Sequence, residues 1–105
     1  MITENDVLAL FDTLERARLH AWIQSGWVRP ARRGRAYLYR EIDVARIGLI
    51  REISEDLAVA EDDLPLVLSL IDQVHGLRRE LKRVCAAIDA EPADIRARIA
   101  RHLAG

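Results

Sequence analysis

Apolar residues recur at helical spacing along most of this chain, with one short strand-like interruption before residue 40. A first helix is expected from residue 4 to about Leu10. Thr3 is a favourable N-cap for it, and Asp6, three residues further on, is expected to close a capping box in part. Asp12 or Thr13 is expected to cap a second helix, whose apolar residues alternate with charged ones at helical spacing.

The second helix is followed by a pattern typical of a β-hairpin. Gly26 falls where a helix ends on a left-handed residue, and Pro30 keeps the residue before it extended. Arg33-Gly34 is expected at the hairpin tip, with Ala36–Tyr39 as the return strand. The aromatic residues are expected to pack between helix and hairpin: Trp22, Trp27, Tyr37 and Tyr39.

A third helix is expected to start near Glu41, with apolar residues spaced for burial on one face. These residues are Ile42, Ala45, Leu49, Ile50, Ile53 and Leu57. A break near residues 57–60 precedes a fourth helix, and the acids at 61–63 favour the positive end of its macrodipole. Pro65 fits the first turn of that helix, where its missing N–H costs least.

The fourth helix carries the strongest periodicity in the chain, because its apolar residues recur at alternating spacings of three and four. This is the a/d seam of a coiled coil over about three heptads, and it begins at Val67. Too little chain remains to cover it in a monomer, so a homodimer is expected. The predicted interface consists of Leu70, Val74, Leu77, Leu81, Val84 and Ile88. A competing interpretation is that a last helix, which begins near Pro92, covers part of the seam within one chain.

Charge is segregated along the chain, although the net charge of the 105 residues is only −1. Positions 16–40 hold seven arginines and no acid, whereas positions 41–63 hold eight acids against two arginines. Solvated helix faces with local ion pairs would give this pattern, and so would a surface that steers a charged partner. The length fits one small domain with an appended helical segment, and we divide the chain into residues 1–60 and 61–105.

No group of side chains in this sequence has the spacing of a catalytic or metal site. The three histidines are scattered, and Cys85 cannot form an internal disulfide, which fits a reducing cytoplasm. Asp62 and Asp63 are adjacent, but neighbours on a helix point about 100° apart and cannot form a catalytic pair. No signal segment or membrane span is found. We therefore expect a cytoplasmic protein that is not an enzyme and needs no cofactor or metal.

The order of helix, glycine, basic hairpin and helix resembles the winged helix-turn-helix of the MerR type, over about residues 3–71. Gly26 and Pro30 keep the frame of that family. The resemblance implies a mainly α fold: a MerR-like winged helix-turn-helix with a small β-hairpin wing, followed by a long dimerisation helix and a short C-terminal helix.

The second helix departs from the MerR pattern at the positions that reach DNA in the family. Where the family has Thr-Ile-Arg-Tyr-Tyr-Glu, residues 18–23 read RLHAWI, so that His20 replaces the arginine, and Ala21 and Trp22 replace the tyrosine pair. A DNA-binding regulator is therefore an alternative and not the favoured function. Its expected contacts are Arg16, Arg18, Arg32, Arg33 and Arg35. A purely structural coiled-coil module is a third, weaker interpretation.

A narrower resemblance covers almost the whole chain. Residues 21–30 (AWIQSGWVRP), 45–52 (ARIGLIRE) and 64–79 (LPLVLSLIDQVHGLRR) are similar to the chaperone-modulator family CbpM. The resemblance implies a protein that binds the J-domain of a CbpA-type co-chaperone. It also implies that binding inhibits the co-chaperone, both in stimulating the Hsp70 chaperone and in binding DNA.

J-domains present a basic helix to Hsp70, so a protein that covers this helix should offer acids. Acids cluster where the third helix ends and the fourth begins, and we hypothesise that they dock the J-domain. They are Glu52, Glu55, Asp56, Glu61, Asp62 and Asp63. The alternative is that these acids only cap the fourth helix.

Overall fold

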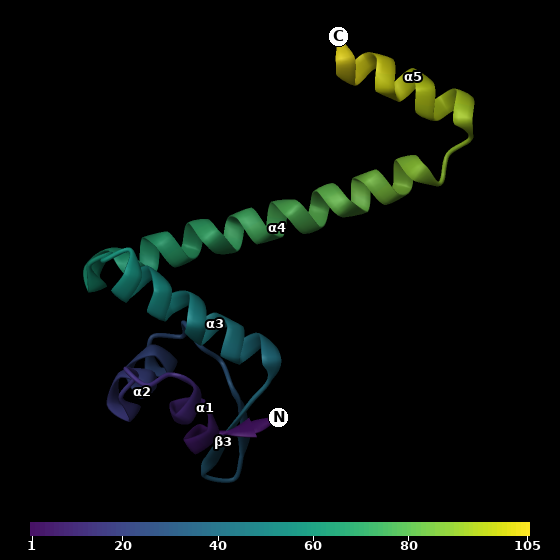
Figure 1. The fold of residues 1–105 in the computed structure, drawn as a ribbon. Helices are drawn as coiled ribbons and strands as arrows, with labels where there is room; N and C mark the ends of the chain where they lie inside the picture. Colours follow the sequence, from purple (N-terminus) through teal and green to yellow (C-terminus); the bar gives the residue numbers. More distant parts are fainter. The chain divides into compact units, whose positions relative to one another are not determined.

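The computed structural model describes residues 1–105 and contains five α-helices and one small antiparallel sheet (Figure 1). This confirms the predicted fold class: a helix-turn-helix with a β wing, a long helix and a C-terminal helix. The chain divides into two units, Met1–Leu68 and Ser69–Gly105. The boundary between them lies inside the long helix α4 (Leu64–Asp89).

Helix α1 (Glu4–Leu10) begins at the predicted capping box. The Asp6 N–H donates to Thr3 Oγ1 at 3.3 Å, and the Thr3 N–H donates to Asp6 Oδ2 at 3.0 Å. These hydrogen bonds favour the charged carboxylate and lower the pKa of Asp6. The backbone N–H groups of Thr3 and Asp6 are thus satisfied by side chains.

Helix α2 (Arg16–Gln24) begins later than expected, because its N-cap is Glu15 and no side chain caps it. The prediction that Asp12 or Thr13 caps this helix was wrong; the Thr13 hydroxyl instead donates to Glu55. The helix buries Leu19 and Trp22. Gly26 follows it with a φ of 77°, as predicted.

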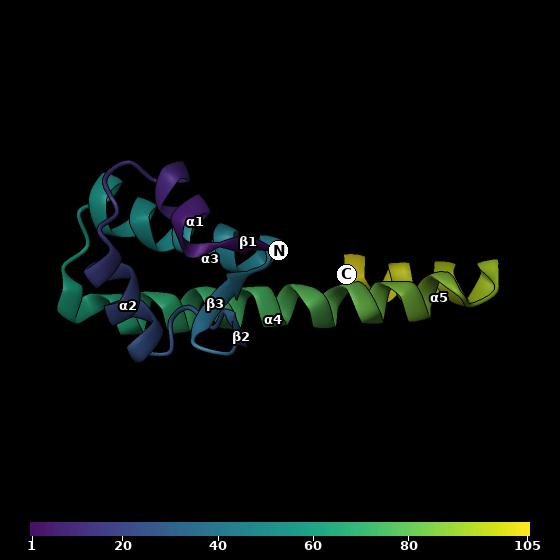
Figure 2. The same ribbon diagram turned by 90° about the horizontal axis from the view of Figure 1, so that it is seen from below.

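The wing consists of β2 (Ala31–Arg33) and β3 (Ala36–Tyr39), which pair antiparallel with Arg33 opposite Ala36 (Figure 2). The return strand is the predicted one, whereas the turn is Gly34-Arg35, one residue later than expected. Gly34 provides the left-handed conformation, with a φ of 63°. A two-residue strand, β1 (Ile2–Thr3), pairs with the other edge of β3.

Helix α3 (Glu41–Arg51) continues into a π-helical turn, η1 (Glu52–Asp56), and its buried face differs from the predicted one. Ile50 and Ile53 are buried as expected, but Ile42 and Leu57 are 70% and 67% exposed. Ala45 is also exposed, and Leu49 is half-buried.

Two local features explain this difference. Asp43 lies in the buried face, where its carboxylate accepts from Arg40 Nε at 2.9 Å, and the adjacent Ile42 points about 100° away from it and is exposed. The Leu57 N–H donates to the Glu52 carbonyl, five residues back, so the wider turn moves Leu57 off the face.

The break between α3 and α4 lies where it was predicted. Ala58 has a φ of 52°, and a 3-10 turn, η2 (Glu61–Asp63), leads into α4 with Pro65 in its first turn. Leu64 and Leu68 from the start of α4 are buried in the first unit. They complete a core whose largest members are Trp22, Tyr39, Leu19, Ile47, Ile50, Val7 and Val28.

The second unit contains the rest of α4 and helix α5 (Ala93–Ala104), which follows Pro92. The predicted seam forms one continuous helical row, but α5 leaves it open: Leu77 is 70% exposed and Leu81 is 62% exposed. Leu70, Val74 and Val84 are also exposed, and Ile88 is half-buried. None of the helices combines the length and the apolar composition that crossing a membrane requires.

Candidate functional site

The face of α2 that would read DNA is bonded to helix α1 through Glu4. Glu4 accepts hydrogen bonds from His20 Nε2 at 2.5 Å and from the Tyr39 hydroxyl at 3.1 Å, and it also pairs with Arg16. Arg16 Nη2 donates to Asn5 Oδ1 at 2.5 Å. Two predicted reading positions therefore contact one internal carboxylate.

Electrostatics keep Glu4 ionised and Tyr39 protonated. Burial alone would raise the pKa of Glu4, but the hydrogen bonds from His20 and Tyr39 and the charges of His20 and Arg16 lower it below its ordinary value. Burial, followed by the nearby Glu4 charge, strongly raises the pKa of Tyr39. The cluster therefore has a fixed donor and a fixed acceptor over the physiological range.

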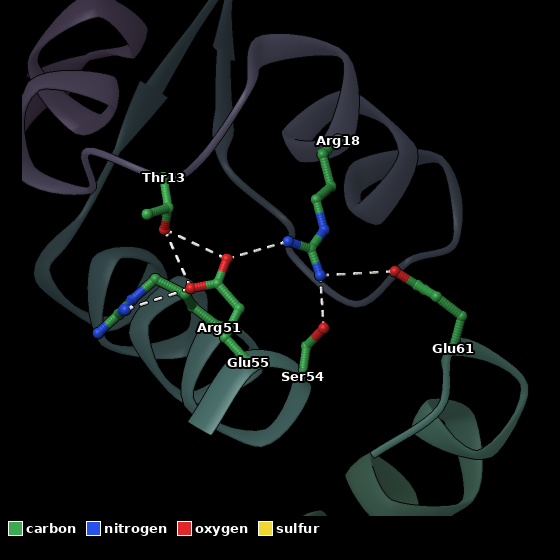
Figure 3. Close-up of polar contacts among 6 residues, drawn as sticks. All are labelled: Thr13, Arg18, Arg51, Ser54, Glu55 and Glu61. Atoms are coloured by element: carbon green, nitrogen blue, oxygen red, sulfur yellow. Dashed lines mark hydrogen bonds and ion pairs between the residues drawn. The ribbon is translucent and has the colours of Figure 1, made fainter. Parts of the chain in front are cut away.

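The second cation of α2, Arg18, is held by residues of η1 and η2, the two turns between α3 and α4 (Figure 3). Its Nη1 donates to Glu55 Oε1 at 3.1 Å, and its Nη2 donates to Ser54 Oγ. Its Nη2 also lies 3.7 Å from Glu61 Oε1. The same guanidinium lies 5.2 Å from the centroid of the Trp22 ring.

Glu55 is the centre of this second cluster, and both of its carboxylate oxygens are engaged. Besides Arg18, it accepts from the Thr13 hydroxyl at 3.0 Å and from Arg51 Nη1 at 3.4 Å, as Figure 3 shows. Its side chain is 27% exposed. Among the six predicted docking acids, the structure thus places Glu55 inside a network. The acids at positions 52, 56, 62 and 63 are exposed.

The arginines of the wing differ from those of α2. Arg32, Arg33 and Arg35 are all exposed, and none of them forms an ion pair with a carboxylate. Arg32 lies 5.5 Å from the centroid of the Tyr37 ring. The predicted DNA contacts are therefore split into two internally paired residues, Arg16 and Arg18, and three outward-facing ones.

No three or more histidine, cysteine, aspartate or glutamate side chains are grouped so that they could hold a metal ion. Cys85 is exposed on α4. Two buried donors, Trp22 Nε1 and Arg51 Nε, have no hydrogen-bond partner. Both belong to side chains that contact the Arg18 and Glu55 cluster, and a buried donor without a partner lowers the stability of the fold.

Comparison with known families agrees with this geometry. Residues 13–57, which run from Thr13 through α2, the wing and α3 to Leu57, match the family model described as MerR HTH family regulatory protein. These residues form a MerR-type helix-turn-helix domain. No curated protein and no solved structure matches the chain with significant similarity.

Proposed function

We propose that this chain is a chaperone modulator of the CbpM type, which binds the J-domain of a CbpA-type co-chaperone and inhibits it. The observation that supports a polypeptide partner most directly is that the cations of α2 form ion pairs inside the domain. Arg16 and Arg18 are already paired with Glu4 and Glu55. A MerR-type domain whose reading helix is neutralised from within is poorly prepared to read a duplex.

The docking surface of this proposal is the acidic surface at the break between α3 and α4. Glu52, Asp56, Asp62 and Asp63 are exposed there, and all lie in the first unit. Glu61, which lies beside Arg18, is also part of this surface, because its side chain is 60% exposed. Such charges mainly raise the association rate and the specificity for a basic helix.

A homodimer through α4 is part of the same proposal. Five of the six seam residues are exposed in the single chain, with Leu77 the most exposed, and Ile88 is half-buried. A contiguous apolar row of this length on a helix is a typical coiled-coil interface. Two copies would therefore present two acidic surfaces.

The test is the affinity of an Asp62→Lys, Asp63→Lys variant for a purified J-domain at low salt. We expect weaker binding, mainly through slower association. A variant with the same change in charge at and just after the other end of α4, Asp89→Lys with Glu91→Lys, is the control and should bind like the parent. Equal affinity of both variants would remove the acidic surface from the proposal.

A DNA-binding regulator of the MerR type is the second candidate, and the wing is the observation that favours it. Arg32, Arg33 and Arg35 are exposed and available to phosphates. This candidate requires selection of one duplex sequence that survives moderate salt. A gel-shift titration over salt, beside a J-domain pull-down, separates the two functions.

A further inference from the structure

Arg18 already has, inside the domain, the contacts that a DNA phosphate would offer it. It projects from α2, the second helix of the helix-turn-helix, which lies against the duplex in DNA-binding domains of this class. Its two terminal nitrogens donate to oxygens of Glu55 and Ser54, and Glu61 supplies a further negative charge. Oxygen acceptors with negative charge are what an arginine fork seeks in a phosphate.

We propose that Glu55 is an internal substitute for a DNA phosphate. By holding Arg18, Glu55 lowers the affinity of this domain for duplex DNA. The proposal depends on the MerR-type domain and not on J-domain binding. Failure of the chaperone-modulator function would therefore leave it standing.

The position of Glu55 favours this role because other residues hold it in place. Thr13 donates to it from the segment before α2, and Arg51 donates from one turn back in α3. A carboxylate fixed in this way pays no association entropy to bind Arg18, whereas a duplex does. An approaching phosphate would also have to displace Glu55 from Arg18, and the negative charges of Glu55 and Glu61 would repel that phosphate.

The proposal makes a quantitative prediction about salt. Each phosphate contact adds about 0.9 to the slope of log affinity against log salt concentration. Releasing Arg18 should therefore steepen the slope for duplex DNA by about one. The corresponding gain in affinity is on the order of tenfold at about 50 mM salt, and it should shrink roughly 3.5-fold by about 200 mM.

The experiment is a salt titration of a fluorescently labelled random-sequence duplex with the full chain and its Glu55→Gln variant. Glutamine keeps the shape and the acceptor oxygen but removes the charge. Glu52→Gln is the matched control, since it removes the same charge from the same π turn and Glu52 is exposed. We expect the steeper slope in Glu55→Gln only, and we expect it to vanish in an Arg18→Ala, Glu55→Gln double variant.

Three results would overturn the proposal. The first is an equal gain in Glu55→Gln and Glu52→Gln, which would reduce the effect to net charge. The second is a gain that persists without Arg18, and the third is no DNA binding by either the parent or the variant at low salt.

Glu61→Gln provides a second route if Glu55→Gln does not melt cooperatively. It touches neither Thr13 nor Arg51, and it should move the slope in the same direction by a smaller amount. With Glu61→Gln, an unchanged slope contradicts the proposal.

Discussion

Replacing Leu77 with alanine should strongly weaken the proposed homodimer, because Leu77 is the most exposed residue of the α4 seam. Its exposed fraction is 70%. Full burial of a leucine side chain is worth about 1.5–3 kcal/mol, so roughly 1–2 kcal/mol remains to be gained when a partner helix covers it. A homodimer contains the residue twice, and the dimer should therefore lose about 2–4 kcal/mol.

This loss corresponds to a roughly 30- to 1,000-fold weaker dimer, at about 1.4 kcal/mol for each factor of ten. Sedimentation equilibrium of the parent and the variant over a range of concentrations measures the two dissociation constants. Leu103→Ala is the control, since Leu103 is 80% exposed on α5 and lies outside the seam. A monomeric parent, or an equal effect of Leu77→Ala and Leu103→Ala, would refute the reasoning.

Three further predictions concern the fold of the first unit. Ile47→Ala should cost about 2–5 kcal/mol of unfolding free energy and Ile42→Ala less than about 0.5, because Ile47 is fully buried and Ile42 is 70% exposed; equal urea midpoints would contradict the buried face described here. Gly26→Ala should lower stability by about 1–2 kcal/mol because φ is 77° at this position, and Gly26→Asn should cost less; identical melting temperatures would contradict this. Because the pKa of Glu4 is lowered in the folded state, its contribution should be present above its ordinary value of 4.5 and be lost as pH falls through the lower folded pKa. The acid limb of the stability curve should therefore flatten in Glu4→Gln, and an unchanged limb would contradict the pairing.

Much of the fold could be predicted from local patterns in the sequence. The capping box of Thr3 and Asp6, the left-handed Gly26, and the return strand at 36–39 depend on neighbouring residues only, and each was predictable. Strand β1 was not, because two residues show no periodicity and pair only after β3 is in place. The start of α2 was misplaced because Thr13 is used by a residue 42 positions away.

The buried face of α3 shows a second limit. A regular helical period placed Ile42 and Leu57 on that face, but Asp43 is buried there in place of Ile42, and a π-helical turn changes the phase before Leu57. Neither feature has a signal in the hydrophobic pattern, since one depends on an ion pair and the other on a single hydrogen bond.

The candidate site was predictable only as two charged regions. Composition separated the arginines of residues 16–40 from the acids of residues 41–63. It could not indicate which of them pair, because Arg18 and Glu55 are 37 positions apart and meet only in the folded domain. The pairing decides which cations remain available on the surface.

Binding of the full chain to a purified J-domain, with duplex DNA titrated in the same buffer, tests the central claim most directly. The account predicts saturable J-domain binding that weakens with salt, and only non-specific duplex binding in the range of about 10⁻⁴–10⁻⁶ M. The contradicting result is no J-domain binding together with one duplex sequence bound about 1,000-fold or more tighter than random sequence.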